Sequence, residues 1–358
     1  MQTAPVNPIA NINTITDRPL FKFGLVADIQ YIDADDGTNF MKTKVRRYRQ
    51  SLQIFRQAMK KWNSFKDPCT FSIVLGDTLD GQTAKSNTQA ECMKDITDIV
   101  RQSRFPCHFC YGNHDYYAFN RTEILKRLIP RRNDGKELYS VSYQTVGGVC
   151  TPDKLYYDFS PCDGFRCVVL DSYDVSIIGP SSPETLHLAN ELLACNNPND
   201  LSKSGTWFTD LPRESRRWVP YNGGISRTQL TWLERVLDVA RNNDESVIIF
   251  CHQPVYAPAV PSCLVWNAEE VLTVLQKAGN VCMWMAGHDH DGQYAMDETG
   301  IHHLVPPAPL ECEPGEVAYG HMEVHVDRLK LCWTGKTPKR SLLPWPTDLI
   351  ISRSALLS

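Results

Sequence analysis

The stretch FSIVLGDTLD (71–80) places Gly76 and Asp77 directly after an apolar run that is typical of a buried β-strand. Four other apolar runs also end in polar clusters. These are Asp28-Ile29-Gln30, Gly112-Asn113-His114-Asp115, His252, and Gly287-His288-Asp289-His290. Polar groups at the carboxyl ends of strands line the crevice where open α/β sheets bind ligands. Together the clusters offer the carboxylates and imidazoles that a pair of divalent cations needs, so we expect them to converge.

The segments around the first three clusters alternate between strand and helix patterns. Short apolar runs predict strands, and apolar residues spaced three and four apart predict helices. The order is strand 21–27, helix 41–65, strand 71–75, helix 88–103 and strand 105–111. This alternation predicts an α/β fold with a mostly parallel sheet and helices packed on it.

The predicted helix 41–65 has two different faces. The apolar face carries Val45, Tyr48, Leu52, Phe55, Met59 and Trp62. The basic face carries Lys42, Lys44, Arg46, Arg47, Arg49 and Arg56. We expect the apolar face to pack on the sheet and the basic face to be solvated.

The rest of the chain predicts one large domain, 1–358, with two additions. Strands 155–160 and 165–171 form a predicted hairpin, and strands 301–305, 317–326 and 328–333 close the fold. The region 174–224 is rich in Pro, Ser, Asn and Gly and also contains aromatic residues, which predicts an ordered, loop-rich lid or binding loop. We expect the tail from about residue 334 to lie over the surface.

Composition excludes several classes of function. The net charge of −4 and the lack of a long basic block argue against nucleic-acid binding. No apolar run approaches the length of a membrane span, and the first twenty residues lack the pattern of a signal peptide. The 13 cysteines are odd in number, so we expect reduced thiols in a cytoplasmic protein.

The clusters differ in how specifically they indicate a metal site. Gly-Asp after a strand is common, but Gly76 allows a tight turn and makes Asp77 the best candidate for a bridging carboxylate. His288 and His290 are two residues apart at a strand end, so each can face a different cation. A single histidine is more often a packed or surface residue. The ordered series of His114, His252, His288 and His290 favours a site.

The order D-x-Q, GDxxD, GNHD, H and GHxH, over about residues 20–330, resembles the calcineurin-like metallophosphoesterase superfamily. The resemblance implies a β-sandwich of mixed sheets flanked by helices (αββα). It also implies two metal sites that share one ligand. Site one would consist of Asp28, Gln30, Asp77 and His290, and site two of Asp77, Asn113, His252 and His288. His114 would face the substrate and form a dyad with Asp80.

Gln30 departs from the superfamily pattern, which usually has histidine at this position. The change replaces an imidazole with a neutral amide oxygen. Hard oxygen ligands suit Mn(II) or Mg(II) better than Zn(II). We therefore expect two divalent cations, with Mn(II) preferred and Mg(II) as the second candidate.

Within the superfamily, the chain resembles the manganese-dependent ADP-ribose/CDP-alcohol diphosphatases, a cytosolic branch. The resemblance rests on Gln30, on ADIQYIDADDGTNF (27–40) and on the insertion before YNGGISRTQLTWLE (221–234). It implies a small nucleotide substrate such as ADP-ribose, CDP-choline or CDP-glycerol, cleaved at the pyrophosphate bond. Residues near the clusters that are candidates for a base pocket, with ordinary packing as the alternative, are Phe40, Tyr116, Tyr117, Tyr256 and Cys263.

Other functions remain open at this point. A phosphomonoesterase or phosphoprotein phosphatase would use the same metal ligands, although a protein substrate needs an open groove that the long insertion disfavours. The lack of an export signal argues against a secreted esterase. A non-catalytic scaffold would be expected to have lost ligands or His114, and none is missing here.

Overall fold

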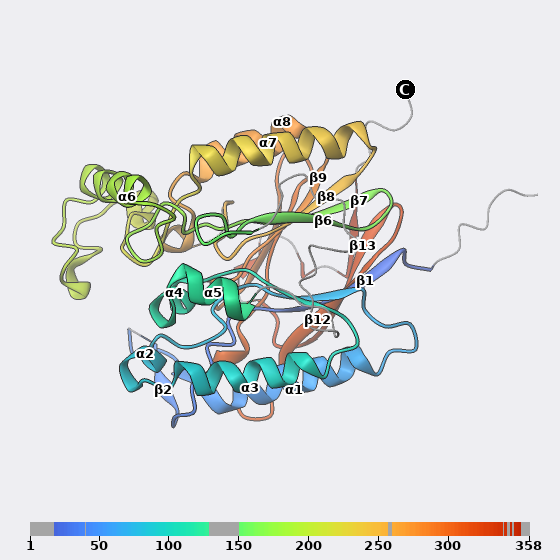
Figure 1. The fold of residues 1–358 in the computed structure, drawn as a ribbon, viewed down its shortest axis with the longest axis horizontal. Helices are drawn as coiled ribbons and strands as arrows, with labels where there is room; N and C mark the ends of the chain where they lie inside the picture. Colours follow the sequence, from blue (N-terminus) through green and yellow to red (C-terminus); the bar gives the residue numbers. More distant parts are fainter. Residues whose placement is uncertain are drawn as a thin grey trace, which may run out of the picture.

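The computed structural model describes residues 18–39, 41–128, 150–256, 260–338, 340–341, 344–345 and 347–351. Two mixed sheets face each other between two layers of helices. The six-stranded sheet has the order β15-β13-β12-β1-β4-β5 and the seven-stranded sheet the order β14-β10-β11-β9-β8-β7-β6. Figure 1 shows α1 and α3 beneath the first sheet and α7 and α8 above the second. This confirms the αββα arrangement.

The six-stranded sheet combines a parallel half with an antiparallel half. Strand β1 pairs in parallel with β4, and β4 with β5, whereas β1–β12, β12–β13 and β13–β15 are antiparallel. The strands are β1 (Phe21–Val26), β4 (Phe71–Val74), β5 (Cys107–Phe109), β12 (Ala318–Val324), β13 (Arg328–Gly335) and β15 (Asp348–Ile350). The predicted alternation in the first 111 residues therefore forms the parallel half of this sheet, and strands from the end of the chain form the antiparallel half.

The seven-stranded sheet has a parallel centre, β7-β8-β9-β11, and β6 forms the predicted antiparallel hairpin with β7. Strand β10 pairs antiparallel with β11 and parallel with β14. The strands are β6 (Tyr157–Cys162), β7 (Phe165–Val169), β8 (Ser246–Phe250), β9 (Val281–Met285), β10 (Gln293–Met296), β11 (His302–Val305) and β14 (Arg340–Ser341). The tail thus adds an edge strand to each sheet, which the surface interpretation did not include.

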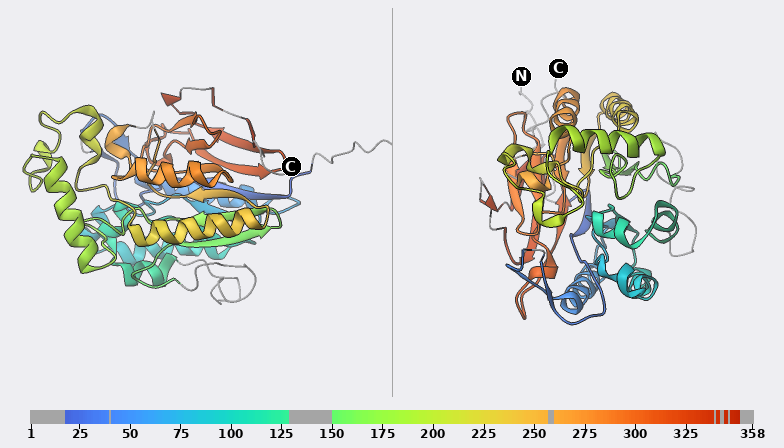
Figure 2. Two further views of the ribbon diagram at one scale, coloured as in Figure 1. Left: turned by 90° about the horizontal axis from the view of Figure 1, so that it is seen from above. Right: turned by 90° about the vertical axis from the view of Figure 1, so that its left-hand side faces the viewer.

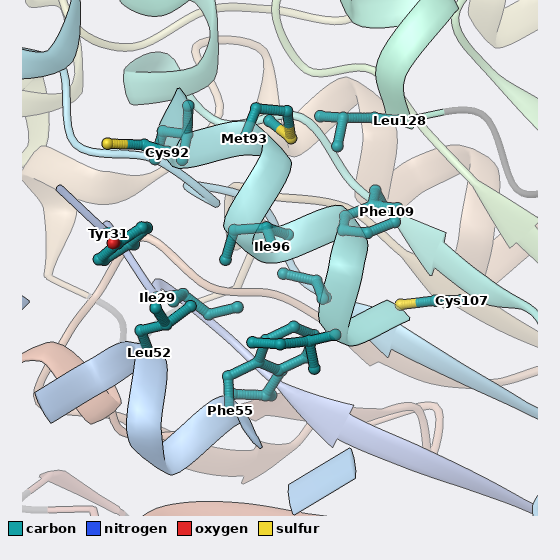
Figure 3. Packing of buried hydrophobic residues seen from close by; sticks show 14 of the residues in the cluster. Ile29, Tyr31, Leu52, Phe55, Cys92, Met93, Ile96, Cys107, Phe109 and Leu128 are labelled. Atoms are coloured by element: carbon teal, nitrogen blue, oxygen red, sulfur yellow. The ribbon is translucent and has the colours of Figure 1, made fainter. Parts of the chain in front are cut away.

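Apolar residues fill three layers of core. One cluster, with Phe23, Phe71 and Phe250, lies between the sheets. A second packs the seven-stranded sheet against α7 (Arg227–Asn242) and α8 (Ala268–Ala278). The third packs the six-stranded sheet against α1 (Tyr48–Asn63) and α3 (Gln89–Arg101). Figure 3 shows Leu52 and Phe55 of α1 within this third cluster.

The first helix begins later than predicted. Helix α1 starts at Tyr48, and Val45–Arg46 is strand β3, paired with β2 (Gly37–Thr38). Tyr48, Leu52, Phe55, Met59 and Trp62 of the predicted stripe are buried, but Val45 is exposed. The backbone N–H of Arg47 donates to Leu310 O, so the residues before α1 are held by another segment. The prediction of a helix from residue 41 was therefore wrong for residues 41–47.

The insertion is less irregular than predicted. It contains α6 (Pro183–Asn196) and the short 3₁₀ helices η2 (Ser204–Thr206) and η3 (Arg213–Arg217). Ser182 caps α6 and Pro183 occupies its first turn. Figure 2 shows α6 at one end of the molecule, beyond the ends of the sheets. Because α6 buries only Ala189 and Leu193, it lacks a strong apolar stripe.

The remaining helices are α2 (Gln82–Ser86), α4 (Asn113–Ala118), α5 (Arg121–Leu128), η4 (Pro261–Cys263) and η5 (Pro309–Glu311). Within the described ranges, no helix has the length and hydropathy needed to cross a bilayer. All 13 cysteines are free thiols. The single domain and the cytoplasmic location remain predictions.

Candidate metal centre

The polar clusters that follow five strands meet at one place. Asp28 follows β1, Asp77 follows β4, Asn113 follows β5, His252 follows β8, and His288 and His290 follow β9. Four of the seven predicted ligands have positive φ, namely Asp28 (49°), Gln30 (41°), Asp77 (50°) and His288 (69°). Such backbone costs free energy in residues other than glycine and gathers at functional sites. The fold thus bends each strand end to bring its side chain into the centre.

Asp77 lies at the middle of this arrangement. It belongs to two groups whose ligand atoms lie within 4.8 Å of one another, Asp28–Asp77–His290 and Asp77–His252–His288. Its Oδ1 accepts the backbone N–H of His114 at 2.8 Å and lies 3.6 Å from His252 Nε2. A carboxylate shared between two groups is what a bridging ligand requires.

Three glycines leave room for these side chains. A Cβ at Gly76 would overlap His252 Nδ1, and a Cβ at Gly112 would overlap Asp77 Oδ1. A Cβ at Gly287 would lie 2.6 Å from Asp28 Oδ2, below any real contact distance. The glycines in the Gly-Asp, Gly-Asn-His and Gly-His motifs therefore permit the close approach of the strand ends.

In site one, Gln30 lies between Asp77 and His290. Its Nε2 donates to Asp77 Oδ2 at 2.9 Å and lies 3.0 Å from His290 Nε2. Its Oε1 is buried and has no hydrogen-bond partner among the described residues. His290 Nε2 lies 3.6 Å from Asp28 Oδ1. A buried amide oxygen without a partner costs free energy, and a cation would satisfy it, so the residues fit a metal.

In site two, the hydrogen bonds set the tautomers of two histidines. His252 Nδ1 lies 2.8 Å from the carbonyl oxygen of Leu75, so it carries the proton and Nε2 is free to bind. Asn222 Nδ2 donates to Arg217 O and Ser262 O, so its Oδ1 accepts from His288 Nε2 at 2.8 Å. His288 Nδ1 then faces His252 Nε2 at 3.1 Å with its lone pair available.

The fourth predicted ligand of site two, Asn113, is held by an aromatic neighbour. Tyr173 is fully buried, and its hydroxyl lies 3.4 Å from Asn113 Oδ1 and 3.3 Å from Tyr221 O, so these two acceptors share its single proton. Tyr173 lies directly before the insertion, and Tyr221 and Asn222 lie near its end. The predicted site two is therefore contacted by Asn222 of the insertion and by Tyr173, the residue that precedes it.

Burial makes the charges of the centre interdependent. Desolvation raises the pKa of Asp28 to about 6. Burial also acts to raise the pKa of Asp77, but His252, His114 and His288 outweigh it and the pKa lies below its usual value. Burial holds the pKa of His288 well below its ordinary value. Buried carboxylates and neutral imidazoles in contact form a donor set that divalent cations stabilise.

The predicted His114–Asp80 pair is close, but its contacts differ from a simple dyad. Asp80 Oδ2 lies 3.5 Å from His114 Nδ1. That nitrogen accepts the backbone N–H of Gly81 at 2.9 Å, so neutral His114 carries its proton on Nε2. Arg46 Nη1 lies 3.5 Å from the same Asp80 oxygen, and its side chain is mostly buried. Burial lowers the pKa of His114, although Asp77 and Asp80 oppose the shift.

The predicted base-pocket residues lie in different surroundings. Tyr116 is buried, donates to Asp171 Oδ1 and contacts Arg121, which indicates a packing role. Tyr117 is exposed and packs edge-on against His114 at 5.5 Å. Tyr256 stacks on His303, whereas Cys263 Sγ lies 4.0 Å from His288 O. Phe40 lies outside the described residues.

Sequence reasoning missed the residues that support the ligands. Arg46 and Lys44 were assigned to a solvated helix face, but Arg46 pairs with Asp80 and Lys44 with Asp291 and Glu311. Glu311 contacts His290, and Asn222 contacts His288. Glu311 ends the short 3₁₀ helix η5 and Asn222 lies outside regular structure, and no local motif marks either residue. A correct start for α1 would have placed Arg46 and Lys44 before the helix.

A family model, calcineurin-like phosphoesterase, matches residues 21–292. The chain belongs to the calcineurin-like phosphoesterase family. As a member of this family, it is a phosphoesterase, a hydrolase. The match includes every predicted metal ligand as well as His114 and Asp80.

This phosphoesterase is also similar to proteins named manganese-dependent ADP-ribose/CDP-alcohol diphosphatase. The Xenopus tropicalis protein is 36% identical and covers 91% of this chain and 95% of the relative. The Arabidopsis thaliana protein is 36% identical, with 89% and 96% covered. A crystal structure of a dimetal phosphatase from Danio rerio is 31% identical, has a TM-score of 0.79 and covers 93% of this chain and 100% of that chain.

Proposed function

We propose that this phosphoesterase is a manganese-dependent diphosphatase of nucleoside diphosphate derivatives. Its substrates would be ADP-ribose, CDP-choline, CDP-glycerol and similar compounds, cleaved to AMP or CMP and a phosphorylated alcohol. The observation that carries the proposal is the pair of buried carboxylate–imidazole groups that share Asp77. The names of the relatives support the choice of metal and substrate.

The proposal assigns the metal ligands as the sequence predicted them. Asp28, Gln30, Asp77 and His290 would hold the cation of site one, and Asp77, Asn113, His252 and His288 that of site two. Two Mn(II) ions bound there supply the charge that activates a water molecule and neutralises phosphoryl oxygens. Mg(II) would fit the same oxygen-rich set less well once three imidazoles are counted.

His114 would act on the substrate as a hydrogen-bond donor. Because Gly81 N–H occupies its Nδ1, the proton of the neutral imidazole is on Nε2. The leaving group of a pyrophosphate is itself a phosphate, which departs as an anion and needs no proton. An Nε2–H donor that stabilises the developing charge is then sufficient. Asp80, anchored by Arg46, would act on His114 through its charge beside Nδ1, because that nitrogen already accepts from Gly81 and has no proton to donate to the carboxylate.

The base of the nucleotide would bind beside site two. Cys263 is the predicted pocket residue that lies against a ligand segment, at His288. Phe40 is the second candidate, carried over from the sequence. Alanine variants of the two should change the ratio of ADP-ribose to CDP-choline hydrolysis, and an unchanged ratio would remove them from the pocket.

The first test is hydrolysis of ADP-ribose, CDP-choline and p-nitrophenyl phosphate by metal-stripped protein with Mn(II), Mg(II) or no metal. Release of AMP and CMP only with Mn(II), with little attack on the monoester, supports the proposal. Activity confined to p-nitrophenyl phosphate would indicate a phosphomonoesterase or phosphoprotein phosphatase. No activity with any metal would favour a non-catalytic scaffold.

A further inference from the structure

The geometry points to Glu311 as the residue that positions His290 and sets the affinity of site one for its cation. The inference rests on the proposed ligand roles. Glu311 lies at the end of η5, far from the sequence motifs, and its side chain is 4% exposed. Its Oε1 lies 2.9 Å from His290 Nδ1.

This contact fixes which nitrogen of His290 faces the centre. A carboxylate can only accept, so Nδ1 carries the proton that it donates to Glu311. The other nitrogen, Nε2, lies 3.0 Å from Gln30 Nε2, an amide donor, and 3.6 Å from Asp28 Oδ1. Because Nδ1 carries the proton, the Nε2 lone pair points into site one, where the amide donor of Gln30 lies closest and a cation would bridge it to the Asp28 carboxylate.

Glu311 differs from the partners of the other two imidazoles. His252 donates to a backbone carbonyl and His288 to the amide oxygen of Asn222, and both partners are neutral. An anionic partner makes an imidazole a stronger donor to a metal than a neutral partner does. Site one also contains the neutral Gln30, so the charge of Glu311 compensates for the weak ligand on the same cation.

Lys44 holds this carboxylate in place. Its Nζ lies 3.0 Å from Glu311 Oε2 and 2.6 Å from Asp291 Oδ1. Lys44 thus anchors the carboxylate of Glu311 through Oε2, and its Oε1 faces His290 Nδ1.

The test is a titration of the metal-stripped full-length chain with Mn(II). The electron paramagnetic resonance signal of free Mn(II) measures how much of the added metal remains unbound. Wild-type protein should bind two ions. Glu311→Gln keeps the shape of the side chain but removes its charge. This variant should bind one Mn(II) ion roughly 10–100-fold more weakly and the other with unchanged affinity. The matched control is Glu313→Gln, two residues away, because Glu313 pairs with Arg47 and does not contact a predicted ligand.

A double-mutant cycle separates positioning from general support of the fold. If Glu311 acts through His290, Glu311→Gln should weaken Mn(II) binding in the wild type but add nothing in the His290→Ala background. Glu311→Asp keeps the charge but is one methylene shorter. Its Mn(II) affinity should lie between those of the wild type and Glu311→Gln. It also provides a folded variant if the glutamine variant does not fold.

Three results would overturn the inference. Wild-type affinity for both ions in Glu311→Gln would remove the positioning role. Equal loss of both ions would make Glu311 a support of the whole centre. Wild-type protein that does not bind two ions would overturn the proposed function itself and the inference with it, which distinguishes the two failures.

Discussion

Site one and site two share Asp77, but different parts of the chain support them in different ways. Site one is supported by charge, from Glu311 and, through it, Lys44, which precedes α1. Site two is supported by neutral groups, Asn222 and Tyr173, at the two ends of the insertion. If the proposed ligands hold two cations, we expect the insertion to affect one of them and the β2–β3 region the other. Each site can therefore be changed separately.

The largest effect should come from the ligand that the two sites share. Asp77→Asn removes the charge that both groups require, so both cations should be lost. Loss of several kcal/mol of metal-ion stabilisation corresponds to about 10³-fold or more in kcat/KM. The measurements are metal content and ADP-ribose hydrolysis, with the exposed Asp98→Asn as control. Retention of two ions would show that the sites do not depend on Asp77.

His114 is not one of the proposed metal ligands. Its substitution therefore tests whether activity can be lost while both cations stay bound. His114→Ala should lower kcat by about 10²–10⁴-fold while two Mn(II) ions remain bound, because the side chain acts on the substrate. Rate and metal content are measured on the same preparation. If metal is lost together with activity, His114 is a ligand and the assignment of site two must change.

The sequence predicted the strand ends and the polar residues that follow them because both are local. An apolar run followed by Gly-Asp or Gly-His needs no tertiary information. The order of these runs predicted parallel strands with packed helices, whereas the sandwich of two mixed sheets was implied by the family resemblance. Local periodicity failed at residues 41–47, where pairing with β2 and a hydrogen bond to Leu310 override the helical pattern. It also failed for α6, which buries too few residues to show a stripe.

The supporting residues were not predictable for a different reason. Glu311 and His290 are 21 residues apart, Asn222 and His288 are 66 apart, and Lys44 and Asp291 are 247 apart. Glu311, Asn222 and Lys44 do not follow a strand in a motif, so only the folded chain reveals these contacts. First ligands come from strand ends, whereas their partners come from any loop that reaches the same end of the sheets.

Gln30→His would reduce the chemical difference between the two sites. It gives site one a second imidazole, and imidazole favours Zn(II) over Mn(II) more than an amide oxygen does. The ratio of Zn(II) to Mn(II) affinity should rise at one of the two sites. The expected rise is roughly 10–100-fold, the usual effect of a change around a metal on its affinity. Competition binding on metal-stripped protein measures it, with Gln30→Asn as an amide control. An unchanged ratio would mean that Gln30 does not bind the cation.

The smallest effect is expected at the neutral partner of site two. Asn222→Ala removes the acceptor that fixes the tautomer of His288. Mn(II) should then bind about tenfold more weakly at one of the two sites, which is the low end of the effect of losing a hydrogen-bond partner of a ligand. Asn197→Ala is the matched control, because Asn197 is also a buried amide of the insertion and donates to Trp207 O and Trp218 O without contacting a ligand. Equal loss in both variants would mean that Asn222 acts only by anchoring the insertion. Mn(II) affinity would instead fall in Asn222→Ala and not in Asn197→Ala if Asn222 acts on His288. If Glu311→Gln weakens the other ion independently, a different part of the chain sets the affinity of each site.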